Sequence, residues 1–516
     1  MTLIRRERLG DLATEVESVL ADLVDRDAVG RMWGLDHTLW SEDPTELADR
    51  LGWLTVTDDM TGAADRLDGI RDRAVADGFT DVVVAGMGGS SLFPEVLART
   101  FGAPDPGAGL TLRVLDSTDP GAVLRTAEHS APEETLIVVS SKSGGTIETR
   151  SHLDWFWDRS REPGRFVVVT DPGSELETLA TDRGFREVFA NRPDIGGRYS
   201  ALSFFGMVPA ALAGVDWQGL VASADAVAPS LRSPDPAVNA GLRLGAVLGA
   251  AVKAGRDKVT FVIDDRISSF GLWLEQLLAE STGKAGTGVV PIVGESLGPV
   301  DTYGNDRLFV AIGHPDQATG LEVLTGSGQP VIELGFERPL DLGAQVLLWE
   351  VATAVCGAVL DINPFDQPNV AEAKAATNRV LEGDRARLPS ASLDEVLDSI
   401  AEGDYLVLQA YVDPHDPVVE QLEEIRLQLH TKYRVATTLG LGPRFLHSTG
   451  QLHKGGPPSG VFVQIVGDDT VDVDVPGRPF TFGQLKRAQA DGDLMTLASH
   501  GLRVVRTTVA DLAART

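Results

Sequence analysis

Short apolar runs alternate with stretches of helical periodicity from about residue 61 onward, and this alternation organises most of the chain. Strands and helices that follow one another in this way are typical of a parallel sheet with helices on both faces. In a first unit, the pattern predicts a helix over 65–76, strands over 81–85, 112–115, 136–139 and 166–170, and a helix from about residue 94.

A second alternating unit begins near residue 240, and a third follows about residue 390. The second is predicted to contain strands over 259–263 and 308–312, a helix over 272–280 and another from about 340 to 360. The third is predicted to contain strands over 405–411, 434–438 and 460–465 and a helix over 418–433. We therefore expect an α/β protein with parallel sheets.

The pattern also suggests how the chain is divided. Residues 1–60 have helical periodicity, which indicates an N-terminal helical arm packed on the main body. Two α/β domains are expected over 61–230 and 237–385, and a C-terminal α/β segment over 390–516, packed on the second domain. Linkers are expected at 228–236 and 383–392.

Polar turns follow the predicted strands of the first unit. One turn is Gly86-Met-Gly-Gly-Ser-Ser91, and another is Ser140-Ser-Lys-Ser-Gly-Gly-Thr146, which leads into a helix with Glu148 in its first turn. In a parallel sheet, ligands bind at the carboxyl ends of the strands, where both turns would lie. Hydroxyl groups, backbone N–H groups and one ammonium at such a position suit a phosphate monoester.

The first turn alone has other interpretations. It resembles the start of a dinucleotide turn, but Ser91 stands where G-x-G-x-x-G has its third glycine. It could also be a tight turn that binds nothing. A sugar-phosphate site is favoured because two hydroxyl-rich turns on one sheet edge converge on one crevice.

Three further residues are candidates for chemistry. Arg198 lies between glycines and small polar residues, so it is either a surface arginine or a guanidinium brought close to an oxyanion. Glu280 ends an apolar helix, where a carboxylate must be paired, for example with Lys284 at i+4, or act as a general base. Lys374 follows a polar turn on a helix and, taken alone, would be an ordinary solvated lysine.

Charge and composition limit the classes of partner that the protein is expected to bind. The 516 residues carry 45 Lys+Arg against 75 Asp+Glu, a formal net charge of −30, which argues against nucleic acid and anionic membrane as partners. The charged start is unlike a signal peptide, and no run approaches the roughly 18 apolar residues of a membrane helix, so we expect a cytoplasmic protein. The single cysteine, Cys356, is expected to be a buried hydrophobe.

Two histidines, His447 and His453, lie in a glycine-rich loop. A metal site is one interpretation, but the loop offers no third ligand at a typical spacing, so we predict no metal.

Taken together, the motifs resemble those of the glucose-6-phosphate isomerase family. The similar segments are Gly86-Met-Gly-Gly-Ser90, Ser141-Lys-Ser-Gly-Gly-Thr-Ile-Glu-Thr149, Gly196-Gly-Arg-Tyr-Ser-Ala-Leu-Ser203, Glu280-Ser-Thr-Gly-Lys284, and Asn363-Pro-Phe-Asp-Gln367 with Lys374. The C-terminal stretch from 405 to 516 is also similar to the isomerase half of fused transaldolase–isomerase proteins. The resemblance implies two sugar isomerase (SIS) domains, each a flavodoxin-like three-layer α/β sandwich, and a homodimer.

The resemblance also implies a role for each residue. The sugar phosphate would be held by Gly89, Ser90, Ser141, Lys142, Ser143 and Thr146, and Gln367 would contact the substrate. Glu280 would move a proton between C1 and C2 of glucose 6-phosphate or fructose 6-phosphate. Arg198 would stabilise the enediolate, and Lys374 would assist ring opening.

One part of the family pattern is displaced. The family has a ring-opening histidine in a segment before the Asn-x-Phe-Asp-Gln motif, whereas the corresponding stretch here, Thr302-Tyr-Gly-Asn-Asp306, contains none. A similar string, Ser448-Thr-Gly-Gln-Leu-His453, comes after that motif instead. We therefore hypothesise that His447 or His453 opens the ring. Two other functions stay open: an isomerase that also accepts mannose 6-phosphate, and a non-catalytic SIS sensor of sugar phosphates.

Overall fold

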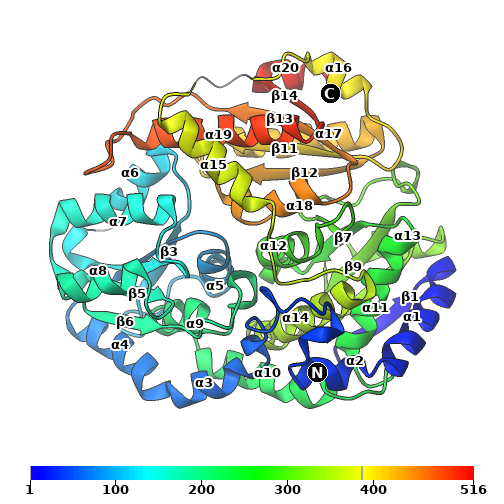
Figure 1. Ribbon diagram of the computed structural model, residues 1–516, viewed down its shortest axis with the longest axis horizontal. Coiled ribbons are helices and arrows are strands. Elements are labelled where there is room, and N and C mark those ends of the chain that lie inside the picture. The colour runs from blue at the N-terminus through cyan, green and yellow to red at the C-terminus, as the bar shows by residue number, and fades with distance from the viewer. Residues whose placement is uncertain (1, 130, 316, 385–387) are drawn as a thin grey trace.

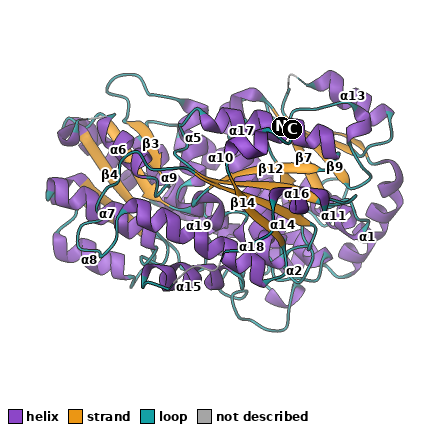
Figure 2. Ribbon diagram, turned by 90° about the horizontal axis from the view of Figure 1, so that it is seen from above, coloured by secondary structure: helices purple, strands orange, loops and turns teal. Residues whose placement is uncertain are grey.

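The computed structural model describes residues 2–129, 131–315, 317–384 and 388–516. Three separate sheets, each flanked by helices, make up the described chain (Figure 1). Seen from above, β3 and β4 lie at one end of the molecule, β7 and β9 at the other, and β12 and β14 between them (Figure 2). The prediction of an α/β protein with parallel sheets is confirmed.

The first sheet is entirely parallel and has the order β3-β2-β4-β5-β6. Valines at the centre of β2 are fully buried because helices cover both faces. Gly86 pairs with Ser140, so the two polar turns leave neighbouring strands at the same edge. The strands are β2 (Asp81–Gly86), β3 (Thr111–Leu115), β4 (Thr135–Ser140), β5 (Phe166–Thr170) and β6 (Glu187–Ala190), and the helices are α4 (Ala64–Ala76), α5 (Leu92–Phe101), α6 (Pro120–Glu128), α7 (Ile147–Ser160), α8 (Glu175–Arg183) and α9 (Phe204–Leu212).

The second sheet has the order β1-β10-β9-β7-β8, in which only β1 is antiparallel to its neighbour. Its strands after the first are β7 (Lys258–Ile263), β8 (Val290–Ile292), β9 (Arg307–Ile312) and β10 (Val331–Leu334). The helices of this part are α10 (Trp217–Leu231), α11 (Ala240–Lys253), α12 (Phe270–Thr282), α13 (Ala318–Gly326) and α14 (Leu342–Val359). The junction between α10 and α11 overlaps the first expected linker, 228–236, but the first four residues of that stretch belong to α10.

The N-terminal arm is not wholly helical, which corrects the expectation for residues 1–60. It begins with β1 (Ile4–Arg8), whose residue Arg8 pairs with Val331 of β10. Four of its five residues are charged, and such residues suit the edge of a sheet, where they also form ion pairs such as Arg6 with Glu333. The helices α1 (Ala13–Asp25), α2 (Ala28–Trp33) and α3 (Val56–Gly62) follow.

The third sheet belongs to the C-terminal segment and has the order β12-β11-β13-β14, all parallel. This segment packs on both α/β domains: Phe482 shares a core with Trp155 of the first domain, and Tyr405 shares one with Ile292 of the second. Its elements are α16 (Leu393–Asp398), β11 (Tyr405–Tyr411), α17 (Val418–Tyr433), β12 (Ala436–Leu441), α18 (Gly450–Gly455), β13 (Gly460–Val466), α19 (Phe482–Ser499), β14 (Arg503–Thr507) and α20 (Val509–Ala513). Helix α15 (Val370–Leu381) precedes this segment in the chain and packs on its helix α19. The second expected linker, 383–392, lies partly outside the described residues.

Helix α14 is more apolar than the sequence analysis allowed. Together with the short turn before it, over Pro339–Val359, it is long and apolar enough to cross a membrane by length and composition. The apolar window of this helix is entirely buried inside the molecule, where it packs on α10, α11 and α12, so α14 is a core helix. Cys356 on this helix is buried, as expected.

Candidate active site

A cavity of about 410 Å³ opens where the two α/β domains and the C-terminal segment meet. Its wall includes all of the predicted site residues except His453. The residues come from both turns of the first sheet, the short turn at Gly197–Tyr199, helices α12 and α15, and the turn Arg444–His447. The structure therefore brings together five motifs that are far apart in the sequence.

The glycines of the first turn are required by close packing. A Cβ atom on Gly89 would lie 1.9 Å from the carbonyl oxygen of Gly197, and Gly88 has a φ of +55°. A Cβ on Gly88 would also lie 2.8 Å from the carbonyl oxygen of His447. These glycines let three turns from different parts of the chain meet, which accounts for them without a dinucleotide.

The second turn gathers hydroxyl groups at the start of α7. The Ser141 and Thr146 hydroxyls lie 3.2 Å apart, and the backbone N–H of Gly144 donates to the Ser141 hydroxyl at 3.2 Å. The Lys142 ammonium lines the cavity but is bound to the Asp171 carboxylate and donates to the carbonyl of Pro193 at 2.9 Å. The turn thus supplies hydroxyls and one cation at a helix N-terminus, the donor set that suits a phosphate.

The carboxylate of Glu280 lies beside the guanidinium of Arg198 deep in the cavity. Arg198 Nη1 is 3.5 Å from Glu280 Oε1, and the two side chains are 3% and 9% exposed. Glu280 Oε2 also accepts a hydrogen bond of 3.1 Å from the Gln276 amide, one helical turn earlier on α12. The i+4 pair with Lys284 is not formed, because Lys284 binds Asp366 instead.

Arg198 is held rigidly by groups around the other side of the cavity. Its Nε donates to the Ser281 hydroxyl at 2.8 Å, and its Nη2 donates to the carbonyls of Pro364 and Asp366 at 2.9 and 2.8 Å. Lys284 also binds the carbonyl of Asp366, and burial together with the Arg198 charge lowers the pKa of Lys284 to about 7. Arg198 is therefore a fixed cation and not a surface arginine.

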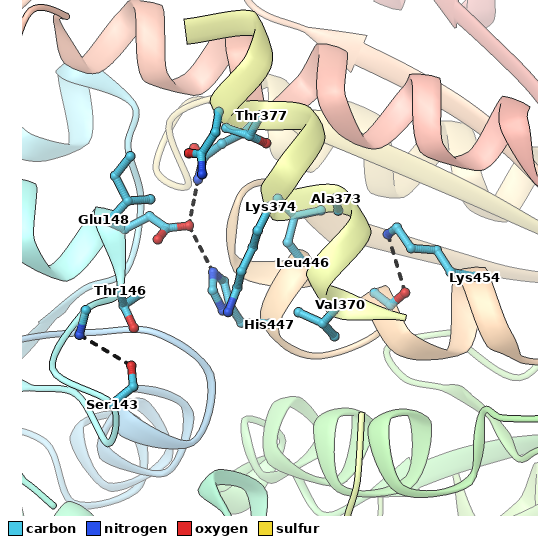
Figure 3. Close-up of a pocket in the computed structure, with 15 residues that line it drawn as sticks. Ser143, Thr146, Glu148, Val370, Ala373, Lys374, Thr377, Leu446, His447 and Lys454 are labelled. Carbon is cyan, nitrogen blue, oxygen red and sulfur yellow. Dashed lines mark hydrogen bonds and ion pairs between the residues drawn. The ribbon is translucent and has the colours of Figure 1, made fainter. Parts of the chain in front are cut away.

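His447 enters the cavity from the C-terminal segment. Its Nε2 lies 2.9 Å from Glu148 Oε1, and Glu148 also accepts a hydrogen bond of 2.6 Å from Gln489. Burial alone would raise the pKa of Glu148, but the charge and the hydrogen bond of His447 outweigh it and hold the pKa below its ordinary value. Lys374, on α15, points toward His447 (Figure 3).

A smaller cavity, of about 240 Å³, continues past His447 (Figure 3). It shares Ser143, Thr146, Lys374 and His447 with the larger one, so the two form one connected site. Among the residues that the structure describes, no group of three or more His, Cys, Asp or Glu is placed to hold a metal ion.

His453 lies elsewhere, inside the C-terminal segment. It is 5% exposed, and its ring packs on Phe445 and Phe462 at centroid distances of 6.0 and 5.1 Å. Burial lowers its pKa well below the ordinary value, so it is a neutral side chain of the core. Of the two histidines that the sequence offered, only His447 reaches the cavity.

Two residues of the site were not singled out from the sequence. Glu148 was noticed only as the first-turn acid of α7, and its partnership with His447 depends on residues 299 positions apart. Gln276 donates both to Glu280 and, at 2.8 Å, to the carbonyl of His447. Its place one helical turn before Glu280 was the available signal, since side chains at i and i+4 lie on the same face.

The arrangement supplies the parts of a proton-transfer site. A buried carboxylate can take up and return a proton, and the adjacent guanidinium can stabilise an oxyanion that forms beside it. Hydroxyls and an ammonium that line the same cavity can hold an anionic group of the same molecule, and a histidine paired with a carboxylate also lines it.

Comparisons of the amino-acid sequence with known proteins identify its family. The family model described as phosphoglucose isomerase matches residues 56–305. A glucose-6-phosphate isomerase of Rubrobacter xylanophilus is 30% identical over 371 residues, covering 60% of this chain and 84% of that protein. A probable glucose-6-phosphate isomerase of Haloarcula marismortui is 31% identical over 366 residues, covering 61% of this chain and 80% of that protein.

Solved structures show the same fold. A hypothetical protein from Thermus thermophilus aligns with a TM-score of 0.62 and 24% identity, over 73% of this chain and all of the other. A glucose-6-phosphate isomerase from Chlamydia trachomatis aligns with a TM-score of 0.58 and 19% identity, over 71% of this chain and 86% of the other. Lys374 and His447 lie beyond the residues matched by the family model.

Proposed function

We propose, on the premise that this chain belongs to the glucose-6-phosphate isomerase family, that it interconverts glucose 6-phosphate and fructose 6-phosphate. The observation that carries this proposal is the pairing of Glu280 with Arg198 at 3.5 Å, in the same cavity as the two hydroxyl-rich turns. An exchange between aldose and ketose needs a base that takes and returns one proton and a cation beside the developing oxyanion. A sugar-phosphate sensor would need only the phosphate turns.

The proton transfer runs through an enediolate. Glu280 removes the proton from C2 of the open-chain aldose and returns it to C1, and the reverse reaction uses the same steps. Arg198 stabilises the negative charge on the oxygen, and because its other nitrogens are fixed by Ser281 and two backbone carbonyls, little reorganisation is needed. Gln276 holds the carboxylate in place through its hydrogen bond to Oε2.

Other residues that line the cavity are assigned to phosphate binding and to ring opening. We assign the phosphate to Gly89, Ser90, Ser141, Lys142, Ser143 and Thr146, all of which line the cavity, and contact with the substrate to Gln367. We assign ring opening to His447 with help from Lys374. Glu148 holds Nε2, and no described residue hydrogen-bonds Nδ1, so we assign the exchange of protons with the substrate to Nδ1.

The test is turnover of fructose 6-phosphate by the purified protein, coupled to glucose-6-phosphate dehydrogenase. Glu280→Gln is expected to lower kcat by about 10²- to 10⁴-fold, because the amide cannot accept the proton. Glu175→Gln is the matched control, since Glu175 is an exposed carboxylate in the first turn of α8. Its turnover should equal that of the wild type.

Each result has a distinct meaning. Equal activity in wild type and Glu280→Gln would show that another group is the base. Absence of activity in both, with fructose 6-phosphate still bound, would contradict the proposed reaction and favour a sensor or another sugar. Mannose 6-phosphate would then be assayed in the same way, and turnover of it by the wild type would assign the broader specificity.

We further propose that the protein acts in the cytoplasm as a homodimer without a cofactor. Support comes from the resemblance of the motifs to those of the family. Sedimentation of the purified protein at micromolar concentration checks the oligomeric state, and a monomer with full activity would contradict it.

A further inference from the structure

A separate cavity, of about 330 Å³, lies between the first α/β domain and the C-terminal segment. We name it the arginine cavity because four guanidinium groups line it: Arg99 of α5, Arg113 of β3, Arg125 of α6 and Arg444 of the turn before His447. His129 and His415 also line it. It shares no lining residue with the active cavity, so it is a distinct site.

Each arginine has one acidic partner. Arg99 pairs with Glu95 at 2.7 Å, and Arg113 pairs with Asp81 at 3.3 Å. Arg125 pairs with Asp413, and Arg444 makes two hydrogen bonds of 2.8 Å to Asp116. Glu95 and Asp116 are the only carboxylates on the described wall of the cavity itself.

These pairs leave hydrogen-bond donors unused. A guanidinium has five N–H donors, and one carboxylate occupies at most two or three of them. The Nε of Arg125 is buried and has no partner among the described residues. Arg113 donates to its described partner Asp81 through Nε alone. An additional anion in the cavity would therefore meet guanidinium groups whose donors are not all used.

Only two of the four arginines are explained by a role in joining the first domain to the C-terminal segment. Arg125 with Asp413 and Arg444 with Asp116 each connect the first domain to the C-terminal segment. Arg99 and Arg113, however, pair with acids of their own domain, so they connect nothing. In a chain with a net charge of −30, a cluster in which four guanidinium groups balance their four carboxylate partners is less negative than the chain as a whole.

We propose that the arginine cavity binds a compact polyanion, either a phosphorylated or a multiply carboxylated metabolite, and that this binding affects the active site. Guanidinium groups bind both kinds of anion through paired hydrogen bonds, and the cavity volume suits a small molecule. The connection is Arg444, which begins the turn that ends at His447, so an anion that draws Arg444 away from Asp116 displaces the residues that carry His447. The anion is thus a regulatory ligand.

Binding is measured by titration calorimetry at low, constant ionic strength, with pyrophosphate and citrate as probes. The wild type is compared with Arg99→Gln, Arg113→Gln and the double variant, none of which removes a link between the domains. Arg73→Gln is the matched control because Arg73 is an arginine of the same domain, paired with Glu187 at 2.7 Å, outside the cavity. Lys142→Gln weakens the phosphate turn of the active cavity and serves as the second control.

The expected result is binding by the wild type that weakens at least about tenfold in the double variant, because that variant loses the charge-assisted hydrogen bonds of two guanidinium groups to the anion. Arg73→Gln and Lys142→Gln should bind as the wild type does. Tighter binding of pyrophosphate would identify a phosphorylated ligand, and tighter binding of citrate a carboxylated one. Absence of binding, or binding lost in Lys142→Gln but kept in the double variant, would overturn the proposal.

The link to the active site is tested by adding the better probe at a saturating concentration to the fructose 6-phosphate assay. We expect kcat/KM to change at least twofold in the wild type and to stay unchanged by the probe in the double variant. An equal change in both proteins would mean that the probe competes in the active cavity, which overturns the link. Calorimetry needs no turnover, so failure of the proposed isomerase reaction would leave the binding result intact.

Discussion

The two edges of the active cavity are built differently. Glu280 and Arg198 lie on elements of the two α/β domains, and Arg198 is tied by three hydrogen bonds besides its contact with Glu280. His447 reaches the cavity from a short turn of the C-terminal segment, and its ring has one hydrogen-bond partner, Glu148 of the first domain. Several hydrogen bonds therefore fix the position of Arg198, whereas the position of His447 depends on how the C-terminal segment packs against the first domain.

This contrast indicates where the site can vary. The residues proposed for the proton transfer lie within 56–305, the part of the chain that matches the family model, whereas His447 lies outside it. A base and its neighbouring cation must be placed accurately for catalysis. A histidine that acts on the ring needs only to reach the same cavity, and a different part of the chain can supply it.

Among the variants that test this comparison, the one that removes the His447 ring is expected to have the largest effect on kcat. His447→Ala should lower kcat on cyclic fructose 6-phosphate by about 100-fold, because the ring must then open without a positioned acid or base. His453→Gln is the control and should keep kcat within about threefold of the wild type, since His453 packs in the core and lies outside both connected cavities. Coupled turnover of both variants is the measurement. Unchanged kcat in His447→Ala would contradict its role.

A smaller effect is expected for Glu148, which we regard as a positioning residue. Glu148→Gln keeps the length of the side chain but removes the charge that faces His447, so kcat should fall about tenfold while KM stays unchanged. Glu148→Asp, which keeps the charge, should recover part of this loss. If KM rose and kcat stayed constant, Glu148 would instead act in binding the substrate.

The smallest effect on turnover is expected at the docking surface itself. His152 on α7 stacks on Phe482 of α19 at 5.7 Å, and burial lowers its pKa from 6.5 to about 4. The unfolded chain then binds a proton below pH 6.5 that the folded chain rejects, so stability falls as the pH drops from 6.5 toward 4. The shift corresponds to roughly 3 kcal/mol over that interval.

Thermal unfolding at pH 7.5 and pH 5 tests this contribution. His152→Gln should reduce the acid-induced fall in the unfolding temperature, with turnover at pH 7.5 little changed. His415→Gln removes an exposed histidine and should leave the fall as it is in the wild type. If acid lowered the unfolding temperature equally in all three proteins, protonation of His152 would not weaken the packing of α7 on α19.

Much of the fold could be predicted from local pattern. The strand Phe166–Thr170, the strand Tyr405–Tyr411 and the helix Val418–Tyr433 have the predicted bounds, because strong apolar runs and helical periodicity define them. Glu280 and Arg198 could be predicted as site residues because the chemistry of each motif is local.

Other features depend on contacts that no local pattern contains. Strand β8 has only the residues Val290–Ile292, and β1 is mostly charged, so neither has the alternation of a strand, and pairing with β7 and β10 defines them. The choice between His447 and His453 depends on which one the folded segment buries. The partnership of Glu148 with His447 joins two domains, and sequence spacing carries no information on it.

Strand β1 also has a consequence for how the protein is made. Its partner strand β10 begins only at Val331, so β1 must wait for residues that are made more than three hundred positions later. Until then the charged edge of β1 has no neighbour, and the second sheet lacks its last strand. Completion of this sheet therefore waits for β10, and the charged side chains of β1 disfavour pairing with other strand edges in the meantime.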